Sequence, residues 1–93
     1  MRVTRINKFE AKDGMADNLH AFLKSIVPLF EQSQGCESCQ VLRSQENANE
    51  FVVIEVWASI SAHQGSVKNI PPEKIGAVMS MLASAPSGSY YAA

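Results

Sequence analysis

Long apolar runs and an excess of charge of either sign are both missing from this sequence. No run of consecutive apolar residues is longer than Phe51–Ile54, whereas a membrane-spanning helix needs roughly 20 apolar residues. Eight basic and nine acidic residues give a net charge of -1, so no positive field would draw the chain to nucleic acid or anionic lipid. Residues 1–10 have no apolar segment typical of a secretory signal. We therefore expect a cytoplasmic protein whose partners include neither membrane nor nucleic acid.

Cysteine is scarce, and the motifs of several cofactor classes are absent. Cys36 and Cys39 are the only cysteines, and two thiols cannot complete a four-ligand zinc site. A redox C-x-x-C motif would be expected to open a helix, but residues 40–43 have the pattern of a strand. The sequence also has no glycine-rich phosphate loop, no G-x-S-x-G and no histidine–carboxylate cluster at metal spacing. We predict two reduced thiols near a turn, no metal site and no nucleotide or flavin cofactor.

The composition is that of one small globular domain. The chain has 93 residues, of which 46% are hydrophobic and 18% charged, with five Gly and four Pro. This balance is typical of a folded protein rather than a disordered or fibrous one. At this length we predict a single domain that spans residues 1–93.

Hydrophobic periodicity predicts six main elements. A period of two indicates strands over residues 2–10 and 37–45, and a near-continuous apolar run rich in β-branched residues indicates a third strand over residues 51–57, covered on both faces. Apolar residues at spacings of three and four indicate a helix from about residue 15 to about residue 32. Pro28 should kink this helix or tighten its last turn. A second helical element should start at Ser59 or Ser61 and be divided at Pro71–Pro72, and its stripe should continue to Leu82. Residues 85–88 should form a turn before a closing strand at residues 89–91.

The predicted order is that of the α+β ferredoxin-like fold, a βαββαβ antiparallel sheet with its first and third strands at the centre. Helices would cover one face of this sheet. The other face would expose Val52, Ile54 and Val56, and their burial would be worth several kcal/mol at about 25 cal/mol per Å2. We therefore predict a homodimer in which two sheets pack face to face.

The opposite side of the third strand should carry the functional site. Period two places Val53, Glu55 and Trp57 beneath the helices. A carboxylate there needs a hydrogen-bonding partner or a shifted pKa, and Arg5 or Asn7 on the neighbouring strand could provide the partner. Polar groups under an apolar roof are typical of a small-molecule pocket. The alternative is purely structural: Glu55 pairs with Arg5 or caps a loop, and Trp57 fills the core.

A histidine lies close to this site along the chain. His63 follows Trp57 by six residues, on or just before the second helix. A neutral imidazole can act as a general base near neutral pH. The alternative is a partly exposed helix histidine with no chemical role.

Several segments together resemble the antibiotic biosynthesis monooxygenase (ABM) domain superfamily. They are RINKFEAKDG, FEQSQGC, CQVLRSQENANEFVVIEVWASISAHQGS and SGSYY, and the resemblance covers nearly the whole chain. Its sharpest element is EVW followed by a short helix start with a histidine. The resemblance implies a dimeric α/β barrel of the ferredoxin-like type.

The resemblance also implies an activity and roles for individual residues. The expected function is a cofactor-independent monooxygenase that oxidises quinol- or anthrone-like polycyclic aromatic substrates with O2. Trp57 would stack on or orient the substrate, Asn7 would hydrogen-bond a substrate or peroxide oxygen, and His63 or Glu55 would be the catalytic base. Further residues expected to contact the substrate are Arg5, Phe9, Phe22 and Val53.

Two other functions stay open at this point. A sister branch of the superfamily binds and degrades haem, and Asn7 and Trp57 match its pattern in kind and strand position. In many members the histidine comes nine residues after the tryptophan, where this chain has Ser66; His63 lies three residues earlier, about 4.5 Å along a helix axis. The third possibility is a non-catalytic protein that binds a small aromatic ligand.

Overall fold

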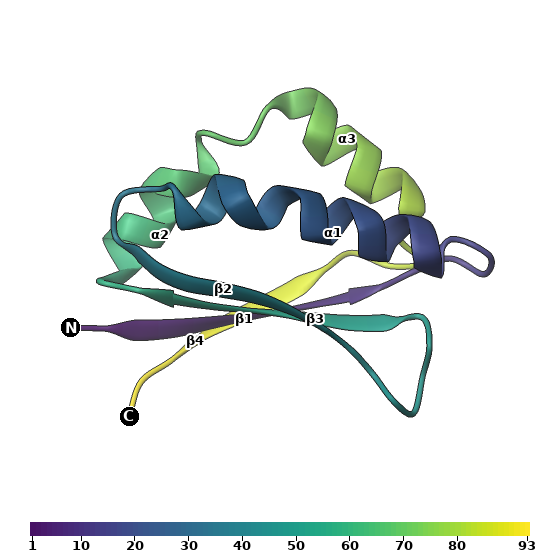
Figure 1. The fold of residues 1–93 in the computed structure, drawn as a ribbon, viewed down its shortest axis with the longest axis horizontal. Helices are drawn as coiled ribbons and strands as arrows, with labels where there is room; N and C mark the ends of the chain where they lie inside the picture. The colour runs from purple at the N-terminus through teal and green to yellow at the C-terminus, as the bar shows by residue number, and fades with distance from the viewer.

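The computed structural model describes all 93 residues as a four-stranded antiparallel sheet with three helices on one face (Figure 1). The strand order is β2-β3-β1-β4, so β1 and β3 form the central pair, as expected for the ferredoxin-like fold. The sheet has two free edges and does not close into a barrel. In chain order the elements are β1 (Val3–Glu10), α1 (Ala16–Glu31), β2 (Cys36–Arg43), β3 (Glu50–Trp57), α2 (Ile60–Val67), α3 (Pro72–Met81) and β4 (Ser87–Tyr91).

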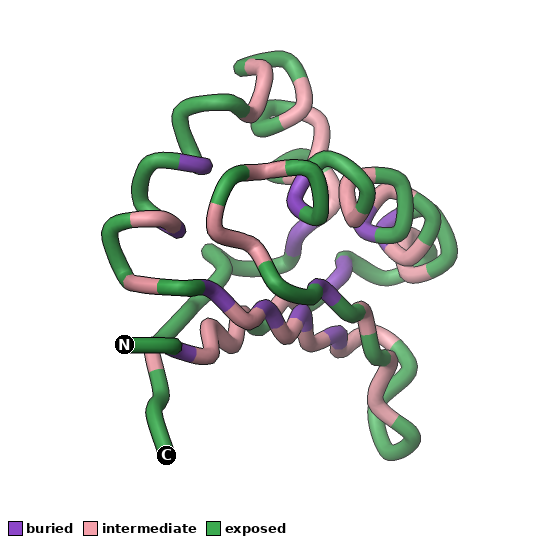
Figure 2. Tube along the Cα trace, turned by 60° about the vertical axis from the view of Figure 1, so that its left-hand side comes forward, coloured by how far each residue is buried: buried purple, intermediate pink, exposed green.

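The core lies between α1 and the sheet. Figure 2 shows the buried residues gathered where the helices face the strands. The alternation along β3 is complete: every second residue is buried and those between are half-buried. The largest fully buried side chains of the core are Leu19, Leu23, Phe51 and Trp57, each with at most 1% of its surface exposed. The buried face of β3 and the apolar stripe of α1 therefore pack against each other, as the sequence predicts.

Pro28 lies in the last turn of helix α1 and lacks the N–H that would bond the carbonyl four residues earlier. The helix continues to Glu31, and the Ser33 N–H donates to the carbonyl of Phe30 at 2.9 Å. This short-range bond closes the turn that follows the helix. Gly35 then turns the chain into β2 with a φ of 89°. A Cβ on Gly35 would lie 2.6 Å from that of Ala62, so glycine is also required for the close approach of α2.

The start of the second helical region agrees with the sequence prediction, but its end does not. Ser59 caps α2, because its Oγ accepts from the N–H of Ala62 at 3.1 Å. The expected extension of α3 to Leu82 is wrong: Leu82 has an extended backbone and forms an isolated bridge with Ala11. Strand β4 begins at Ser87, two residues before the predicted start. Pairing with β1, which local sequence signals do not report, extends the strand into the expected turn.

The sheet face opposite the helices is left uncovered by the chain itself (Figure 1). Val52, Ile54 and Val56 are half-buried on this face, and Leu42 and Tyr91 are 42% and 55% exposed.

No helix combines the length and the apolar character that crossing a membrane would need.

Candidate functional site

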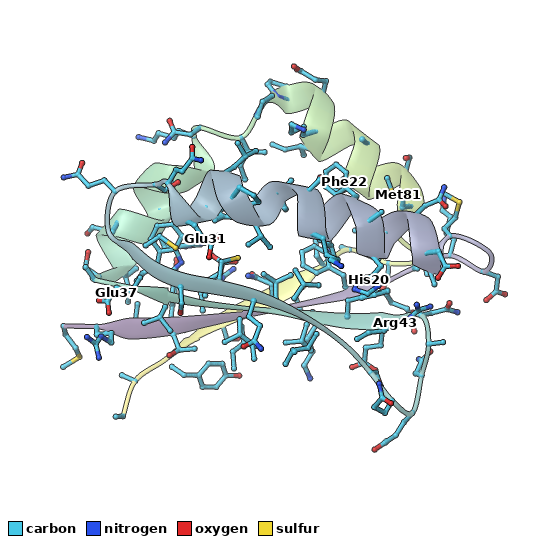
Figure 3. All side chains as sticks on the ribbon, viewed as in Figure 1. His20, Phe22, Glu31, Glu37, Arg43 and Met81 are labelled. Carbon is cyan, nitrogen blue, oxygen red and sulfur yellow. The ribbon has the colours of Figure 1, made fainter.

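A cavity of about 290 Å3 lies between the helix-covered face of the sheet and all three helices. Its sheet side carries polar residues and its helical side is mainly apolar. Phe22 lies on the side of α1 toward α3 (Figure 3). The residues that line the cavity are Arg5, Asn7, Phe9, Phe22, Leu23, Ile26, Phe30, Val53, Glu55, His63, Val67, Ile70, Lys74, Ile75, Val78 and Pro86.

The two central strands supply the polar floor. In the β1–β3 register, Arg5 is opposite Glu55 and Asn7 is opposite Val53. Side chains alternate between the faces of a strand, so these four residues all point toward the helices. The floor thus collects a cation, an amide and a carboxyl group from residues that lie about fifty positions apart in sequence.

Glu55 is the centre of the polar network. Its Oε2 accepts from Asn7 Nδ2 at 2.7 Å, and its Oε1 accepts from the indole Nε1–H of Trp57 at 2.9 Å. Asn7 is held in turn by Arg5, whose Nε donates to Asn7 Oδ1 at 3.0 Å. The sequence left open whether Arg5 or Asn7 would pair with Glu55, and the structure shows that Asn7 does. Arg5 forms no ion pair with Glu55 within 4.0 Å and acts on it only at longer range.

Burial changes the acidity of this carboxyl. Glu55 is 2% exposed, and desolvation raises its pKa. The hydrogen bond from Trp57, the charge of Arg5 and the hydrogen bond from Asn7 all act in the opposite direction, because they favour the charged form. A carboxylate with a raised pKa is a stronger base than a free glutamate, and it is held ready to receive a proton.

The raised pKa of Glu55 predicts how stability depends on pH. Above about pH 4 the unfolded chain releases this proton before the native protein does. The native state then binds more protons, so the free energy of unfolding falls as the pH rises toward the folded pKa. A Glu55→Gln variant lacks this decline. Its stability relative to wild type should rise with pH over that range and then level off, as measured by urea denaturation at a series of pH values.

His63 titrates in both proteins of that comparison, so its contribution largely cancels. The informative quantity is how the difference in stability between the two proteins changes with pH. The glutamine amide faces two hydrogen-bond donors, and the effect of this on stability does not depend on pH. A relative stability of Glu55→Gln that declines with rising pH would mean that the native fold lowers the pKa of Glu55, contrary to the prediction.

His63 stands beside Glu55 and faces protein groups with both ring nitrogens. It is 8% exposed. Its Nδ1 is 2.6 Å from the hydroxyl of Tyr90, and its Nε2 is 3.9 Å from Glu55 Oε1. The Tyr90 hydroxyl donates to Nδ1 when Nε2 carries the proton, and accepts in the other tautomer. Burial and the charge of Arg5 lower the pKa of His63, so the imidazole is neutral near pH 7 and available as a base.

Arg5 is positioned by β4. Its guanidinium carbon lies 4.6 Å from the centre of the Tyr90 ring, within range for a cation–π contact. Gly88 makes room for this arrangement, because a Cβ there would lie 2.5 Å from Asn7 Oδ1 and 2.7 Å from Arg5 Cζ. The terminal nitrogens of Arg5 form no hydrogen bond within the protein, so they are free to meet a ligand.

Trp57 is not on the cavity wall. It is completely buried and is absent from the residues that line the cavity. Its ring meets those of Phe30 and His63 edge to face, with centroids 6.4 and 5.4 Å away. In this arrangement Trp57 cannot stack on a bound ligand, and it holds Glu55 through its indole N–H instead.

The other expected site residues do meet at the cavity. They are Arg5, Asn7, Phe9, Phe22, Val53, Glu55 and His63. Sequence reasoning missed most of the roof, including Val67, Ile70 and Lys74. It also left open which C-terminal tyrosine faces inward; the structure assigns this position to Tyr90, while Tyr91 is exposed. The spacing of α3 residues indicated a helix but could not indicate which surface that helix would cover.

The two cysteines lie on β2 beside this site and form no disulfide. A bulge between Cys36 and Ser38 brings Cys36 opposite Trp57 and Cys39 opposite Glu55. Desolvation and the nearby Glu55 raise the pKa of both thiols, that of Cys39 to about 12. Thiols with a raised pKa are poor nucleophiles, so the C-x-x-C spacing here does not provide a reactive pair.

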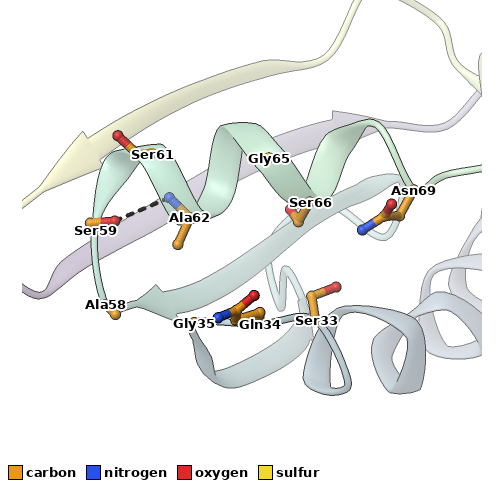
Figure 4. Close-up of a pocket in the computed structure, with 10 residues that line it drawn as sticks. All are labelled: Ser33, Gln34, Gly35, Ala58, Ser59, Ser61, Ala62, Gly65, Ser66 and Asn69. Atoms are coloured by element: carbon orange, nitrogen blue, oxygen red, sulfur yellow. Dashed lines mark hydrogen bonds between the residues drawn. The ribbon is translucent and has the colours of Figure 1, made fainter.

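A larger hollow of about 520 Å3 lies on the other side of α2 (Figure 4). It is lined by small and neutral side chains from α2 and from the turn before β2, among them Ser33, Gly35, Ala62 and Asn69. No titratable residue lines it. The smaller cavity beneath the helices is therefore the candidate site, because it alone joins an apolar enclosure with groups that can move protons.

The profile of the family described as antibiotic biosynthesis monooxygenase (ABM) matches residues 2–74. Among curated proteins no match was found.

Solved structures of similar fold cover almost the whole chain. Rv0793 from Mycobacterium tuberculosis superposes with a TM-score of 0.86 and 20% identity, over 100% of this chain and 95% of that one. SnoaB from Streptomyces nogalater, a cofactor-independent oxygenase, gives a TM-score of 0.83 and 19% identity, over 99% and 92%. A conserved protein from Methanosarcina mazei Go1 gives 0.86 and 15%, over 98% and 91%. At these identities the likeness to solved structures establishes the fold alone.

Proposed function

This chain belongs to the antibiotic biosynthesis monooxygenase family, and from that premise we propose that it is a cofactor-independent monooxygenase acting on quinol- or anthrone-like aromatic substrates. The observation that carries the proposal is a buried carboxyl with a raised pKa, Glu55, on the floor of an otherwise largely apolar cavity. The similarity of fold to SnoaB, itself a cofactor-independent oxygenase, is consistent with this activity.

The reaction needs a base and a dry enclosure rather than a redox group. The base removes a proton from a substrate carbon that is activated by neighbouring keto or phenol groups. The carbanion then gives its electrons to O2 and forms a C–O bond. The resulting hydroperoxide loses water as its O–O bond breaks and the second hydrogen leaves as a proton. A CH2 group and O2 thus become a carbonyl group and water, so the substrate supplies all the electrons.

Glu55 and His63 together are the proposed base. Glu55 in its charged form accepts the proton, and its raised pKa favours the transfer. The neutral His63 lies just beyond hydrogen-bonding distance of Glu55, at 3.9 Å, so a small movement would let it take the proton onward. Tyr90 fixes the orientation of the imidazole through its contact with Nδ1.

Arg5 and Asn7 are proposed to stabilise the charge that develops on the substrate. A positioned cation and an amide that face a developing oxyanion lower the barrier most strongly where water is excluded. The free terminal nitrogens of Arg5 can serve this purpose while its Nε holds Asn7. Trp57 is a positioning residue, since it acts through Glu55.

The apolar walls suit a compact aromatic substrate. Phe9, Phe22 and Val53 are proposed to contact its rings, together with apolar residues of α2 and α3. The volume of about 290 Å3 is at the lower end of the roughly 300–1,000 Å3 typical of small-molecule sites. This size favours a substrate with few fused rings.

The residues present do not fit haem. His63 is the only histidine that lines the cavity, and its two nitrogens face Tyr90 and Glu55. Ligation through Nε2 would leave the contact with Tyr90 intact but would need room for a tetrapyrrole beside Glu55, in a cavity of only about 290 Å3. Titration with haemin should therefore leave the Soret band where it is for free haemin.

Oxygen uptake tests the reaction class. The purified protein should consume O2 when supplied with reduced quinols or anthrones and no added cofactor, and should release a quinone-type product. If ligands of this kind bind but no oxygen is consumed, the protein is an aromatic-ligand binding protein and the proposal fails.

We also propose that the protein is a homodimer. The uncovered face of the sheet carries half-buried Val52, Ile54 and Val56 with exposed Leu42 beside them. An apolar sheet face of this kind is stabilised when a second copy covers it, and a two-fold axis would bring the same patch of each copy into contact.

Light scattering tests the dimer. The wild-type mass should be twice the 10.1 kDa of one chain. Ile54→Asp places a charge in the centre of the face and should yield monomer. Ile60→Asp makes the same change at the start of α2, where Ile60 is 42% exposed, and should remain dimeric. A wild type that is monomeric at micromolar concentration would contradict the proposal.

A further inference from the structure

Lys74 is the one charged residue of the cavity that the proposed reaction does not use. It comes from α3, on the helical side, whereas Arg5 comes from the sheet. It is half-buried, and its side chain forms no ion pair or hydrogen bond within the protein. Its neighbours on the wall are the apolar Ile70, Ile75 and Val78.

The charges around the cavity are unbalanced. Arg5 and Lys74 are its only cations, and Glu55 is its only acid. His63 is neutral near pH 7. The protein as a whole has a net charge of -1, so the cavity wall is more positive than the average of the molecule. A cavity of this kind favours an anionic ligand over a neutral one of the same shape.

The two cations are suited to different parts of a ligand. Arg5 is fixed among Asn7, Tyr90 and Gly88 next to Glu55, where the proton is removed. Lys74 belongs to the roof helix α3, whose other lining residues, Ile75 and Val78, are apolar. A flexible ammonium at the apolar end can reach an acidic group that the reaction leaves unchanged.

We propose that Lys74 binds a carboxylate on the substrate, so that the substrate class is an aromatic acid rather than a neutral polycycle. This inference rests on the proposed function for the identity of the reacting end. The carboxylate sets the direction in which the ring system enters: its acidic group stays beneath α3 and its reactive carbon lies over Glu55. Lys74 is therefore a specificity-determining residue.

Equilibrium binding of two unreactive probes tests the proposal. The probes are a naphthalene carboxylate and the matching carboxamide, which have nearly the same shape and differ in charge. Wild-type protein should bind the carboxylate about five- to tenfold more tightly, and added salt should weaken this preference. Lys74→Gln should bind the two probes equally, and Lys74→Glu should prefer the amide.

Lys68→Gln is the matched control, because Lys68 is an exposed lysine at the end of α2 that does not line the cavity. It should keep the wild-type preference. Equal binding of the probes to wild type, no measurable binding of either, or a preference that survives in Lys74→Gln would overturn the proposal. The measurement involves no turnover. A protein that selects the acid through Lys74 but consumes no oxygen would refute the proposed function and retain this inference.

Discussion

Glu55→Gln is expected to lower kcat/KM for oxygen uptake about a hundred- to ten-thousand-fold, the usual contribution of a general base. The substitution keeps the shape of the side chain but removes the group that accepts the proton. His63 remains nearby, and so does the enclosure around the substrate. The rate should therefore fall to a low residual value rather than to zero. Oxygen-electrode measurements across a range of substrate concentrations would separate the change in kcat from any change in KM.

Glu50→Gln provides the matched control. Glu50 is the first residue of the same strand and lies outside the cavity, so its substitution should leave the rate unchanged. The far-ultraviolet circular dichroism spectra of the two variants should agree. A Glu55→Gln variant that folds and retains activity within about threefold of wild type would remove Glu55 from the mechanism and leave His63 as the base.

Leu23→Ala is expected to have the largest effect on stability, with a loss of about 2–5 kcal/mol in the free energy of unfolding. Leu23 is 1% exposed, packs in the core and also lines the cavity. Its truncation loses apolar contacts and enlarges a space that the rest of the fold cannot collapse to fill. Urea denaturation should show a lower midpoint with an unchanged slope.

Leu29→Ala makes the same change on the same helix at a residue that is 44% exposed. Helix propensity changes equally in both variants, so the difference between them isolates burial. Leu29→Ala should stay within about 0.5 kcal/mol of wild type. Similar losses in the two variants would show that α1 does not pack against the sheet as described.

The sheet was predictable because its signals are local. The near-continuous apolar, β-branched run of residues 51–57 indicated a strand covered on both faces, and the structure buries every second residue there and half-buries those between. The errors lie where pairing decides the outcome. Leu82 continues the apolar spacing of α3, yet its bridge with Ala11 draws it out of the helix. Ser87 lies in a predicted turn but pairs with Lys8.

The candidate site was only partly predictable. The shared face of Asn7 and Glu55 follows from period two and from the order of the strands. The contact between His63 and Tyr90 joins residues 27 positions apart through the packing of α2 over β4, and no pattern in the sequence reports it. Trp57 shows the limit most clearly: the motif gave its strand and face, but the packing of Phe30 and His63 over it removes it from the cavity. The cytoplasmic location stays a prediction.

The attachment of α3 has a consequence for how ligands reach the interior. Its C-terminal end is tied to the end of β1 through backbone hydrogen bonds of Lys12 to Met81 and of Ala83 to Glu10. None of its ten residues is buried. A segment with no buried residue is among the parts of a protein that open at low free energy. Entry and release can therefore proceed by a hinged swing of this helix about its tether, while the proton-transfer groups on the strands keep their positions.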